Sequence, residues 1–404
     1  MTYKQAILKL RIERLGMFPF VALGRLFGVI FPLKTKHRLF LFFPSADIGG
    51  APQVNIDITN CMRDAKPVII FSKKPLNNQF RAFFEMEGVR IIDLHRYIDN
   101  KLFHFVNFFF RGVLATWINR SENPTVFGGE SLFFYKVIPH IRKDILCVEL
   151  CHLGTWMHYT IGLIDRIDKR VFSTLKLKED VIKQYDENHI DSSLYKRLYF
   201  VDNATEIPAF VQINNRNTEV VFIGRGSPQK RVHLIADIAR KMNQANDPVH
   251  FSFVGDVDRV IRLEDYPFCT FYGNVNDGAL MKKIYQQSDV LILTSAFEGL
   301  PMVIMTMMAY GKTVLSTAVN GIPDYIHHME NGLLITATDE PNVVEEGVQL
   351  LRYFIQHPEL KLKFAAYNRK FAEEKFSMQA FCKSYRGLLG LVGRPESEVR
   401  RQEQ

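Results

Sequence analysis

Cysteine is scarce in this chain, and the spacing of its cysteines is not typical of a metal or redox site. Only five occur in 404 residues, an odd number with no visible pairing pattern. Cys147 and Cys151 are separated by three residues, whereas redox and zinc sites commonly use the C-x-x-C spacing. We therefore expect free thiols in a reducing cytoplasm, and neither a metal site nor another cofactor.

The sequence also lacks an apolar run long enough for a membrane-spanning helix. Such a helix needs about 20 predominantly apolar residues. The two apolar runs near the start of the chain, 15–24 and 26–33, are separated by Arg25, and Pro19 lies within the first. No clear small-residue cleavage site accompanies them, so a signal peptide is not expected either.

Acidic side chains are nearly missing from residues 1–38, where Glu13 is the only one. Eight basic residues give this segment a net charge of +7, out of +8 for the whole chain: Lys4, Lys9, Arg11, Arg14, Arg25, Lys34, Lys36 and Arg38. The rest carries about +1, which disfavours nucleic-acid binding. Basic and apolar residues together predict that residues 1–37 lie on an anionic membrane surface. The alternative is a helix packed on the neighbouring domain.

What the chain does contain is a series of short apolar segments that each end in a glycine or polar turn. Its 404 residues and 47% hydrophobic content allow two domains with large cores. The predicted strand 38–43 precedes Gly49 and Gly50, and the predicted strand 144–150 precedes His152. Glycines at such a turn let backbone amides approach a phosphate. A parallel sheet binds ligands at the carboxyl ends of its strands, so these turns are candidate sites.

The second half repeats this arrangement with cations in the turn. A predicted strand at 219–224 leads into Arg225, Lys230 and Arg231, and a helix follows. Cations at this edge can hold a diphosphate and offset the charge of a leaving nucleotide. The alternative is that they are ordinary solvated surface charges.

Residues 289–335 hold the turn on which the interpretation of the chain depends. A predicted strand at 289–294 ends shortly before Glu298, and a Met-rich apolar helix then stops at Gly311. A second short strand begins at Thr313. The order strand, loop, helix, strand puts Glu298 at the carboxyl end of a parallel strand, beside the free N–H groups of a helix start.

This segment resembles the donor-binding segment of retaining glycosyltransferases of family 4 (glycosyl transferases group 1), which have the GT-B fold. The family pattern is a Glu in an E-G-x-P turn, a second Glu eight positions later, an A-x-G helix end and a glycine turn. The matching residues are Glu298, Gly299, Pro301, Ala309, Gly311 and Gly321. Thr306 stands where the family has its second Glu. The earlier turn matches the family's G-R-x(4)-K-G through Arg225 and Lys230, with Arg231 in place of the last glycine.

The resemblance covers most of residues 219–391, and residues 38–205 through the arrangement of strands and turns. It implies an α/β protein with the GT-B fold: two facing Rossmann-like domains, the donor in the cleft between them, and a C-terminal helix that crosses back to the first domain. The predicted segments are a membrane-associating segment at 1–37, an acceptor domain at 38–205, a nucleotide-sugar donor domain at 206–365, and the crossover helix with the tail at 366–404.

The resemblance also implies roles for individual residues. The candidate catalytic residues, expected to contact the donor sugar, are Glu298 and His152, with His158 as the alternative histidine. The expected ligands of the donor diphosphate are Arg225, Lys230, Gly50, Gly299, Leu300 and Pro301. The expected ligands of the nucleoside are Asn274, Val275 and Thr306. The family needs no metal, so Asp256 and Asp258 are not interpreted as a metal site.

The implied reaction moves a hexose from a nucleotide-sugar to a hydroxyl acceptor, with retention of the anomeric configuration. The basic, apolar N-terminus favours a lipid-linked acceptor at the cytoplasmic face of the cell membrane, as in the assembly of bacterial lipopolysaccharide, capsule or O-antigen. Two alternatives stay open. One is a non-catalytic GT-B partner subunit, because Thr306 replaces the second Glu, and the other is a nucleotide-sugar epimerase.

Overall fold

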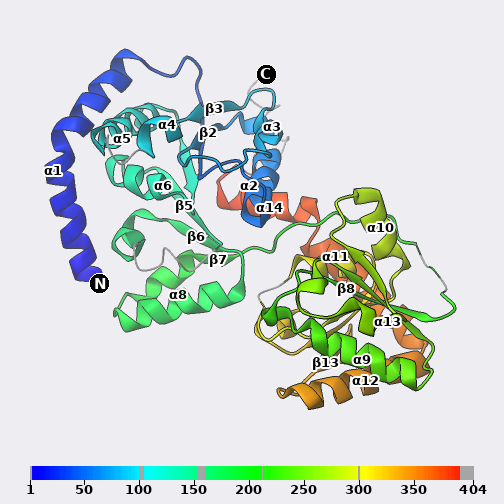
Figure 1. The fold of residues 1–404 in the computed structure, drawn as a ribbon. Helices are drawn as coiled ribbons and strands as arrows, with labels where there is room; N and C mark the ends of the chain where they lie inside the picture. Colours follow the sequence, from blue (N-terminus) through cyan, green and yellow to red (C-terminus); the bar gives the residue numbers. More distant parts are fainter. Residues whose placement is uncertain are drawn as a thin grey trace, which may run out of the picture. The chain divides into compact units, whose positions relative to one another are not determined.

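The computed structural model of the chain describes residues 2–99, 104–152, 160–211, 213, 215–298 and 301–391. They form two compact units (Figure 1). Unit 1 consists of the chain up to Asp202 and again from Phe381 onward, and unit 2 is Asn203–Ala380. Each unit contains a parallel sheet with helices on it, so the predicted α/β class is confirmed.

Unit 1 is built on a seven-stranded parallel sheet in the order β3-β2-β1-β4-β5-β6-β7. Its strands are β1 (Leu39–Phe43), β2 (Val68–Phe71), β3 (Arg90–Asp93), β4 (Thr125–Gly128), β5 (Leu146–Cys151), β6 (Lys169–Phe172) and β7 (Leu198–Phe200). β1, β2 and β4 are buried along their whole length, as apolar strands covered on both faces should be. The strand order reverses between β1 and β4, where a doubly wound sheet binds ligands at its carboxyl edge.

Helices lie on both faces of this sheet. Its longer helices are α2 (Gly50–Cys61), α5 (His104–Asn119), α6 (Leu132–Val137), α8 (Leu175–Glu187) and α14 (Met378–Leu388), and its single turns are α3 (Arg81–Phe84) and α4 (His95–Ile98). The connections through α2 and α5 run in opposite directions across the sheet, so right-handed crossovers put these helices on opposite faces. Leu114, Ala115 and Ile118 of α5 belong to the main core of unit 1.

The N-terminal helix α1 (Tyr3–Ile30) packs along α5 on the outer side of unit 1 (Figure 1). The two backbones come so close that their contact requires glycine. A Cβ atom at Gly24 would lie 2.0 Å from the Phe109 carbonyl oxygen, and one at Gly112 would lie 2.1 Å from the Val21 carbonyl oxygen. The segment 1–37 therefore contains a packed helix, which was the alternative expectation. None of the helices in the described ranges is long and apolar enough to cross a lipid bilayer.

Unit 2 is built on a six-stranded parallel sheet in the order β10-β9-β8-β11-β12-β13. Its strands are β8 (Thr218–Ile223), β9 (Val249–Val254), β10 (Thr270–Gly273), β11 (Val290–Leu293), β12 (Thr313–Thr317) and β13 (Leu333–Ile335). Its helices are α9 (Val232–Gln244), α10 (Gly278–Gln287), α11 (Met302–Ala309), α12 (Glu340–Gln356) and α13 (Glu359–Lys375). Because β8 connects to β9 and β11 to β12 in opposite directions, right-handed crossovers place α9 and α11 on opposite faces.

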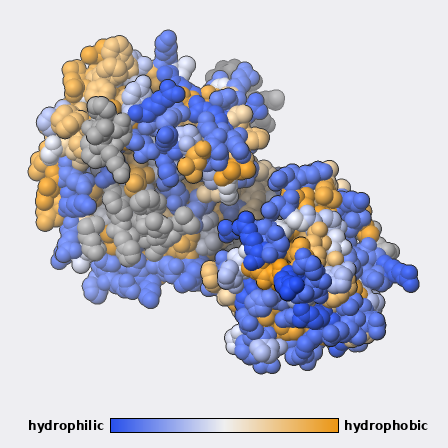
Figure 2. Space-filling view, in the orientation of Figure 1, coloured by the Kyte–Doolittle hydropathy of each residue, from blue (hydrophilic) through white to orange (hydrophobic). Residues whose placement is uncertain are grey.

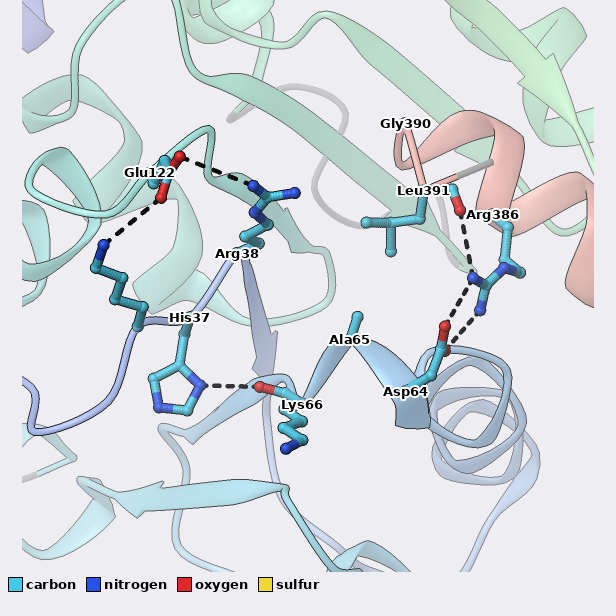
Figure 3. A pocket seen from close by; sticks show the side chains of 10 residues that line it. His37, Arg38, Asp64, Ala65, Lys66, Glu122, Arg386, Gly390 and Leu391 are labelled. Atoms are coloured by element: carbon cyan, nitrogen blue, oxygen red, sulfur yellow. Dashed lines mark hydrogen bonds and ion pairs between the residues drawn. The ribbon is translucent and has the colours of Figure 1, made fainter. Parts of the chain in front are cut away.

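The C-terminal helix α14 is tied to unit 1 by a disulfide between Cys61 and Cys382. Beside it, Arg386 donates two hydrogen bonds of 2.7 and 2.8 Å to the Asp64 carboxylate, which lowers the pKa of that group (Figure 3). The disulfide shows that the expectation of unpaired cysteines was wrong. The partners lie 321 positions apart, so no local spacing could reveal them. Cysteine usage therefore no longer favours a reducing compartment.

We expect the denatured, unreduced protein to expose three reactive thiols, those of Cys147, Cys151 and Cys269. Full reduction should raise the number to five. Titration with a chromogenic disulfide reagent in guanidinium chloride measures both values. Cys382→Ser should release the Cys61 thiol and abolish the difference between the two titrations. Five thiols before reduction would contradict the disulfide.

Candidate functional site

Two loops of unit 2 meet at the carboxyl edge of its sheet. One follows β8 and spans residues 224–231, and the other follows β11 and begins at residue 294. β8 and β11 are hydrogen-bonded neighbours at the point where the strand order reverses. Parallel strands at such a point bring their following loops together, so two segments far apart in the sequence form one surface.

Hydrogen bonds join these two loops directly. The Ala296 N–H donates to the Gln229 carbonyl at 2.8 Å, and Gln229 Nε2 donates to the Phe297 carbonyl at 2.9 Å. The Thr294 hydroxyl donates to the Arg231 carbonyl at 2.9 Å. The position of each loop therefore depends on the other.

Arg231 fixes the second loop through its guanidinium group. The group donates to the carbonyl oxygens of Thr294 at 2.7 Å and Ser295 at 3.2 Å. The Arg231 backbone is left-handed, with φ of 46°, a conformation that favours glycine. The resembled family has glycine at this position. Here the side chain offsets the backbone strain by bridging the loops, so Arg231 is a positioning residue rather than a free cation for a diphosphate.

Lys230 and Glu298, predicted from two separate motifs, form an ion pair between the loops. Lys230 Nζ donates to Glu298 Oε1, and the Ser295 hydroxyl donates to the same oxygen at 2.6 Å. The two side chains are only 14% and 8% exposed, so solvent screens the pair weakly. The Glu298 N–H also donates to the Asn320 side-chain oxygen at 3.3 Å. A phosphate that competes for Lys230 would free the carboxylate for a sugar hydroxyl.

Arg225 is exposed at the start of the first loop, and its charge acts on Asp256. The Gly226 N–H donates to Asp256 Oδ1 at 3.0 Å, and Arg259 pairs with Oδ2 at 3.0 Å. The Gly226 N–H is the main cause of a lowered pKa at Asp256, with smaller effects of Arg259 and Arg225. Asp256 therefore orders the glycine turn. Within the described part of the chain, no group of three or more His, Cys, Asp or Glu could hold a metal ion.

The other predicted residues of the second loop are Gly299, Leu300 and Pro301. Gly299 and Leu300 lie outside the described residues, and Pro301 is the N-cap of α11. Thr306 donates its hydroxyl to a carbonyl of the preceding turn at 3.0 Å and lies 3.3 Å from the Thr205 hydroxyl. Thr306 therefore presents hydroxyl lone pairs, and no carboxylate, near the start of α11.

Asn274 and Val275 follow β10, the edge strand of the sheet. Asn274 is exposed and Val275 is half-buried. The Gly255 N–H donates to the Gly273 carbonyl at 2.8 Å, which ties this loop to the end of β9. β9 and β8 separate these residues from the Glu298 loop, so a ligand that touches both must extend along the carboxyl edge.

In unit 1, Gly50 and His152 lie at the carboxyl edge, after β1 and β5 respectively. Gly50 is the first residue of α2, and the space where a side chain would stand is open. The His152 N–H donates to Glu130 Oε1 at 3.0 Å. Its ring Nε2 atom is buried and has no hydrogen-bond partner in the described ranges. Burial lowers the pKa of His152 to about 4, so its ring is neutral near pH 7. His158 lies outside those ranges.

Three side chains of these edges were not among the predicted site residues: Glu130, Ser295 and Asn320. Glu130 has a left-handed backbone and follows Gly129, whose Cβ would lie 1.8 Å from a carbonyl oxygen of β5. That close approach of β4 and β5 brings Glu130 to His152. Each of the three lies two or three positions after the end of a strand, which was the available signal, but most polar residues of that kind only cap turns.

A cavity of about 820 Å³ lies at the opposite, amino edge of the unit 1 sheet (Figure 3). Its lining residues are Lys36, His37, Arg38, Asp64, Ala65, Lys66, Glu122, Arg386, Gly390 and Leu391. Glu122 lies 3.8 Å from Lys36 and 3.9 Å from Arg38, while Arg386 is paired with Asp64. The cavity contains none of the predicted site residues, and its ion pair holds α14.

Comparison with known proteins shows that most of unit 2 is similar to a known protein family. Residues 217–353 match the family model described as Glycosyl transferases group 1. The chain is 25% identical to an N-acetyl-alpha-D-glucosaminyl L-malate synthase of Bacillus anthracis, over 44% of this chain and 46% of that protein. The chain thus spans about half the length, or less, of the curated relatives that it matches.

Solved structures share the fold of the chain. The crystal structure of HepE from Anabaena in complex with UDP matches with a TM-score of 0.66 at 15% identity, over 88% of this chain and 100% of that one. The lipopolysaccharide outer core galactosyltransferase WaaB matches with a TM-score of 0.63 at 17% identity, over 88% and 99%. This fold is the GT-B fold of glycosyltransferases, as predicted. Unit 2 carries a glycosyltransferase domain.

We expect Arg231→Ala to destabilise the protein by about 1–3 kcal/mol, because two carbonyl oxygens lose a charged donor. Arg231→Gly should be destabilised less, since glycine relieves the positive φ. Urea unfolding followed by circular dichroism measures the free energy of unfolding. We expect it to be highest for the wild type, lower for Arg231→Gly and lowest for Arg231→Ala. Arg259→Ala is the control, because its side chain is 71% exposed. An Arg231→Ala variant as stable as wild type would show that the bridge contributes nothing.

Proposed function

We propose that this chain is a glycosyltransferase that moves a sugar from a nucleotide-sugar to a hydroxyl acceptor. The Lys230–Glu298 pair carries the proposal, because it joins an anion-binding cation to a hydrogen-bonding carboxylate at one pair of strand ends. Both residues belong to the segment that matches the Glycosyl transferases group 1 model. Arg225 supplies a second, exposed cation at the same edge.

In the proposed reaction, Arg225 and Lys230 bind the donor diphosphate and stabilise the charge that develops on it as its bond to the sugar breaks. The N–H groups at the start of α11, after Pro301, add dipolar stabilisation. Lys230 then releases Glu298, whose carboxylate orients the sugar through its hydroxyl groups. The sugar carbon gains a bond to the acceptor oxygen, and the acceptor proton passes to the departing diphosphate.

We further propose that the acceptor attacks from the face that the diphosphate leaves, which retains the anomeric configuration and requires no protein nucleophile. In this proposal His152, at the carboxyl edge of the unit 1 sheet, contacts the donor sugar, and Gly50 lies at the diphosphate. The nucleoside is bound along the unit 2 edge by Asn274, Val275 and Thr306. Gly299 and Leu300 also bind the diphosphate in this proposal, which includes no metal or other cofactor.

Uridine diphosphate sugars are the donors to test first, and a lipid-linked glycan is the proposed acceptor. HepE was solved with UDP-glucose, which supports the uridine donor. The name of WaaB refers to the lipopolysaccharide outer core, which supports a bacterial surface polysaccharide as the product. The arguments from HepE and from WaaB both come from similarity of fold, so the donor base and the acceptor are proposals.

A non-catalytic partner subunit is the second candidate function, and Thr306 is the observation that favours it. Its hydroxyl proton is already donated to a backbone carbonyl, so it can only accept from a ribose hydroxyl. Three retained groups argue for turnover instead, because a chain without a donor would not need Arg225, Lys230 and Glu298 together. No specific observation favours a nucleotide-sugar epimerase.

We expect calorimetric titration with UDP, GDP and CDP to show one nucleotide binding to the full chain. Arg225→Ala should weaken that binding about 10- to 100-fold, as expected for a lost hydrogen bond to a charged group. Arg259→Ala is the matched control, because it removes a solvent-exposed cation close by. Equal loss in both variants would indicate only a general charge effect. Binding of none of the three would contradict a working donor site.

We expect Glu298→Gln to separate donor binding from turnover. The amide oxygen can still accept from Lys230 and Ser295, but the charge that holds Lys230 is lost, so affinity for the free nucleotide should be kept or increased. Release of nucleotide from the matching nucleotide-sugar should fall by about 100-fold or more. Unchanged turnover would show that Glu298 has no catalytic role, and lost nucleotide binding would show that it holds the loop instead.

A further inference from the structure

Helix α1 has two apolar faces, and unit 1 covers only one of them. The covered face carries the buried residues of the helix: Ala6, Met17, Val21, Gly24 and Gly28. The opposite face exposes large apolar side chains along nearly its whole length, each at least 39% exposed: Leu8, Ile12, Leu15, Phe18, Leu23, Leu26, Phe27, Val29 and Ile30. Figure 2 shows this apolar surface where α1 forms the outer side of unit 1. A surface helix normally confines its large apolar residues to the face that packs on the protein.

The outer face cannot turn inward, because glycine contacts fix the rotation of α1 on α5. A Cβ at Gly28 would lie 2.9 Å from the Thr116 Cβ, which adds to the backbone contacts of Gly24 and Gly112. The Trp117 ring N–H also donates to the Phe31 carbonyl at 2.8 Å, just past the end of the helix. Something other than unit 1 must therefore cover the outer face, or it stays in water.

The exposed stripe is straight, because its spacing matches the period of an α-helix. Ile12 and Leu23 lie eleven positions apart, and so do Leu15 and Leu26. Eleven residues complete about three turns, so these side chains stay on one side of the helix. From Leu8 to Ile30 the stripe is about 33 Å long at a rise of 1.5 Å per residue. A flat apolar surface therefore matches the stripe better than a small pocket would.

The charges beside the stripe are nearly all positive. The five basic residues of α1 are exposed: Lys4, Lys9, Arg11, Arg14 and Arg25. Glu13, the only acid of α1, lies 3.5 Å from Lys136 and is half-buried. A second copy of the chain would bring two sets of these basic side chains together, which opposes self-association. An anionic surface complements the same side chains.

We propose that the outer face of α1 docks on an anionic lipid bilayer. The apolar stripe lies at the boundary of head groups and acyl chains, and the basic side chains contact lipid phosphates. The docking does not depend on glycosyl transfer. Its consequence for the acceptor rests on the proposed function, since unit 1 would be held at the surface that contains a lipid-linked glycan.

The test is co-sedimentation of the full-length protein with phospholipid vesicles. We expect binding to phosphatidylcholine vesicles that contain phosphatidylglycerol, weaker binding to phosphatidylcholine alone, and a loss of that preference at high salt. Leu15→Ser combined with Leu26→Ser should reduce the bound fraction about tenfold or more. Leu76→Ser combined with Leu362→Ser is the matched control, because these leucines are 89% and 54% exposed outside α1.

Deletion of α1 is not a suitable variant, since it would also uncover the α5 face on which the helix packs. The two serine substitutions affect exposed side chains, and circular dichroism checks that the fold is kept. Equal binding of the α1 variant and the control would overturn the proposal, as would no vesicle binding at all. A lipid-free dimer that Leu15→Ser and Leu26→Ser dissociate would assign the face to a second copy. Nucleotide titration of the same variants tests unit 2 separately.

Discussion

The contact between the loops after β8 and β11 is the constraint on which the unit 2 site depends. Neither loop belongs to a long helix or strand over the residues that carry the chemistry, so each needs the other for its shape. Gln229 and Arg231 supply hydrogen bonds that satisfy carbonyl groups of the partner loop. The Lys230–Glu298 pair then closes the contact with a weakly screened charge interaction. An anion that binds Lys230 would act directly on this contact and therefore on the Glu298 carboxylate.

Unit 1 also depends on close contacts between segments, and there glycine residues make the contacts possible. Gly129 lets the end of β4 lie against a β5 carbonyl, and this brings Glu130 to the backbone of His152. On the outer side, Gly24 and Gly112 let α1 and α5 touch through their backbones. Both contacts would be lost with any larger residue, because the Cβ atom would overlap backbone atoms rather than flexible side-chain ends.

The C-terminal helix α14 is held on unit 1 by groups that are remote from it in the sequence. The Cys61–Cys382 disulfide, the Arg386–Asp64 pair and a hydrogen bond from Thr125 to the Leu389 carbonyl all join α14 to elements of the first half. Together they make the last described residues part of unit 1 rather than a loose extension of unit 2.

Local sequence was sufficient for the α/β class, for most strands, and for the candidates Arg225, Lys230 and Glu298. Strand ends, turn glycines and the charges beside them are encoded within a few residues, and a parallel sheet gathers strand ends at one edge for geometric reasons. Several features needed the folded chain: the pairing of Lys230 with Glu298, the bridging role of Arg231, the contribution of Glu130, and the disulfide. Each joins segments of different strands or helices, and which segments meet depends on strand order and helix packing. For the same reason the residues of α1 indicated an apolar, basic helix, while only its packing on α5 determined which apolar face remains exposed.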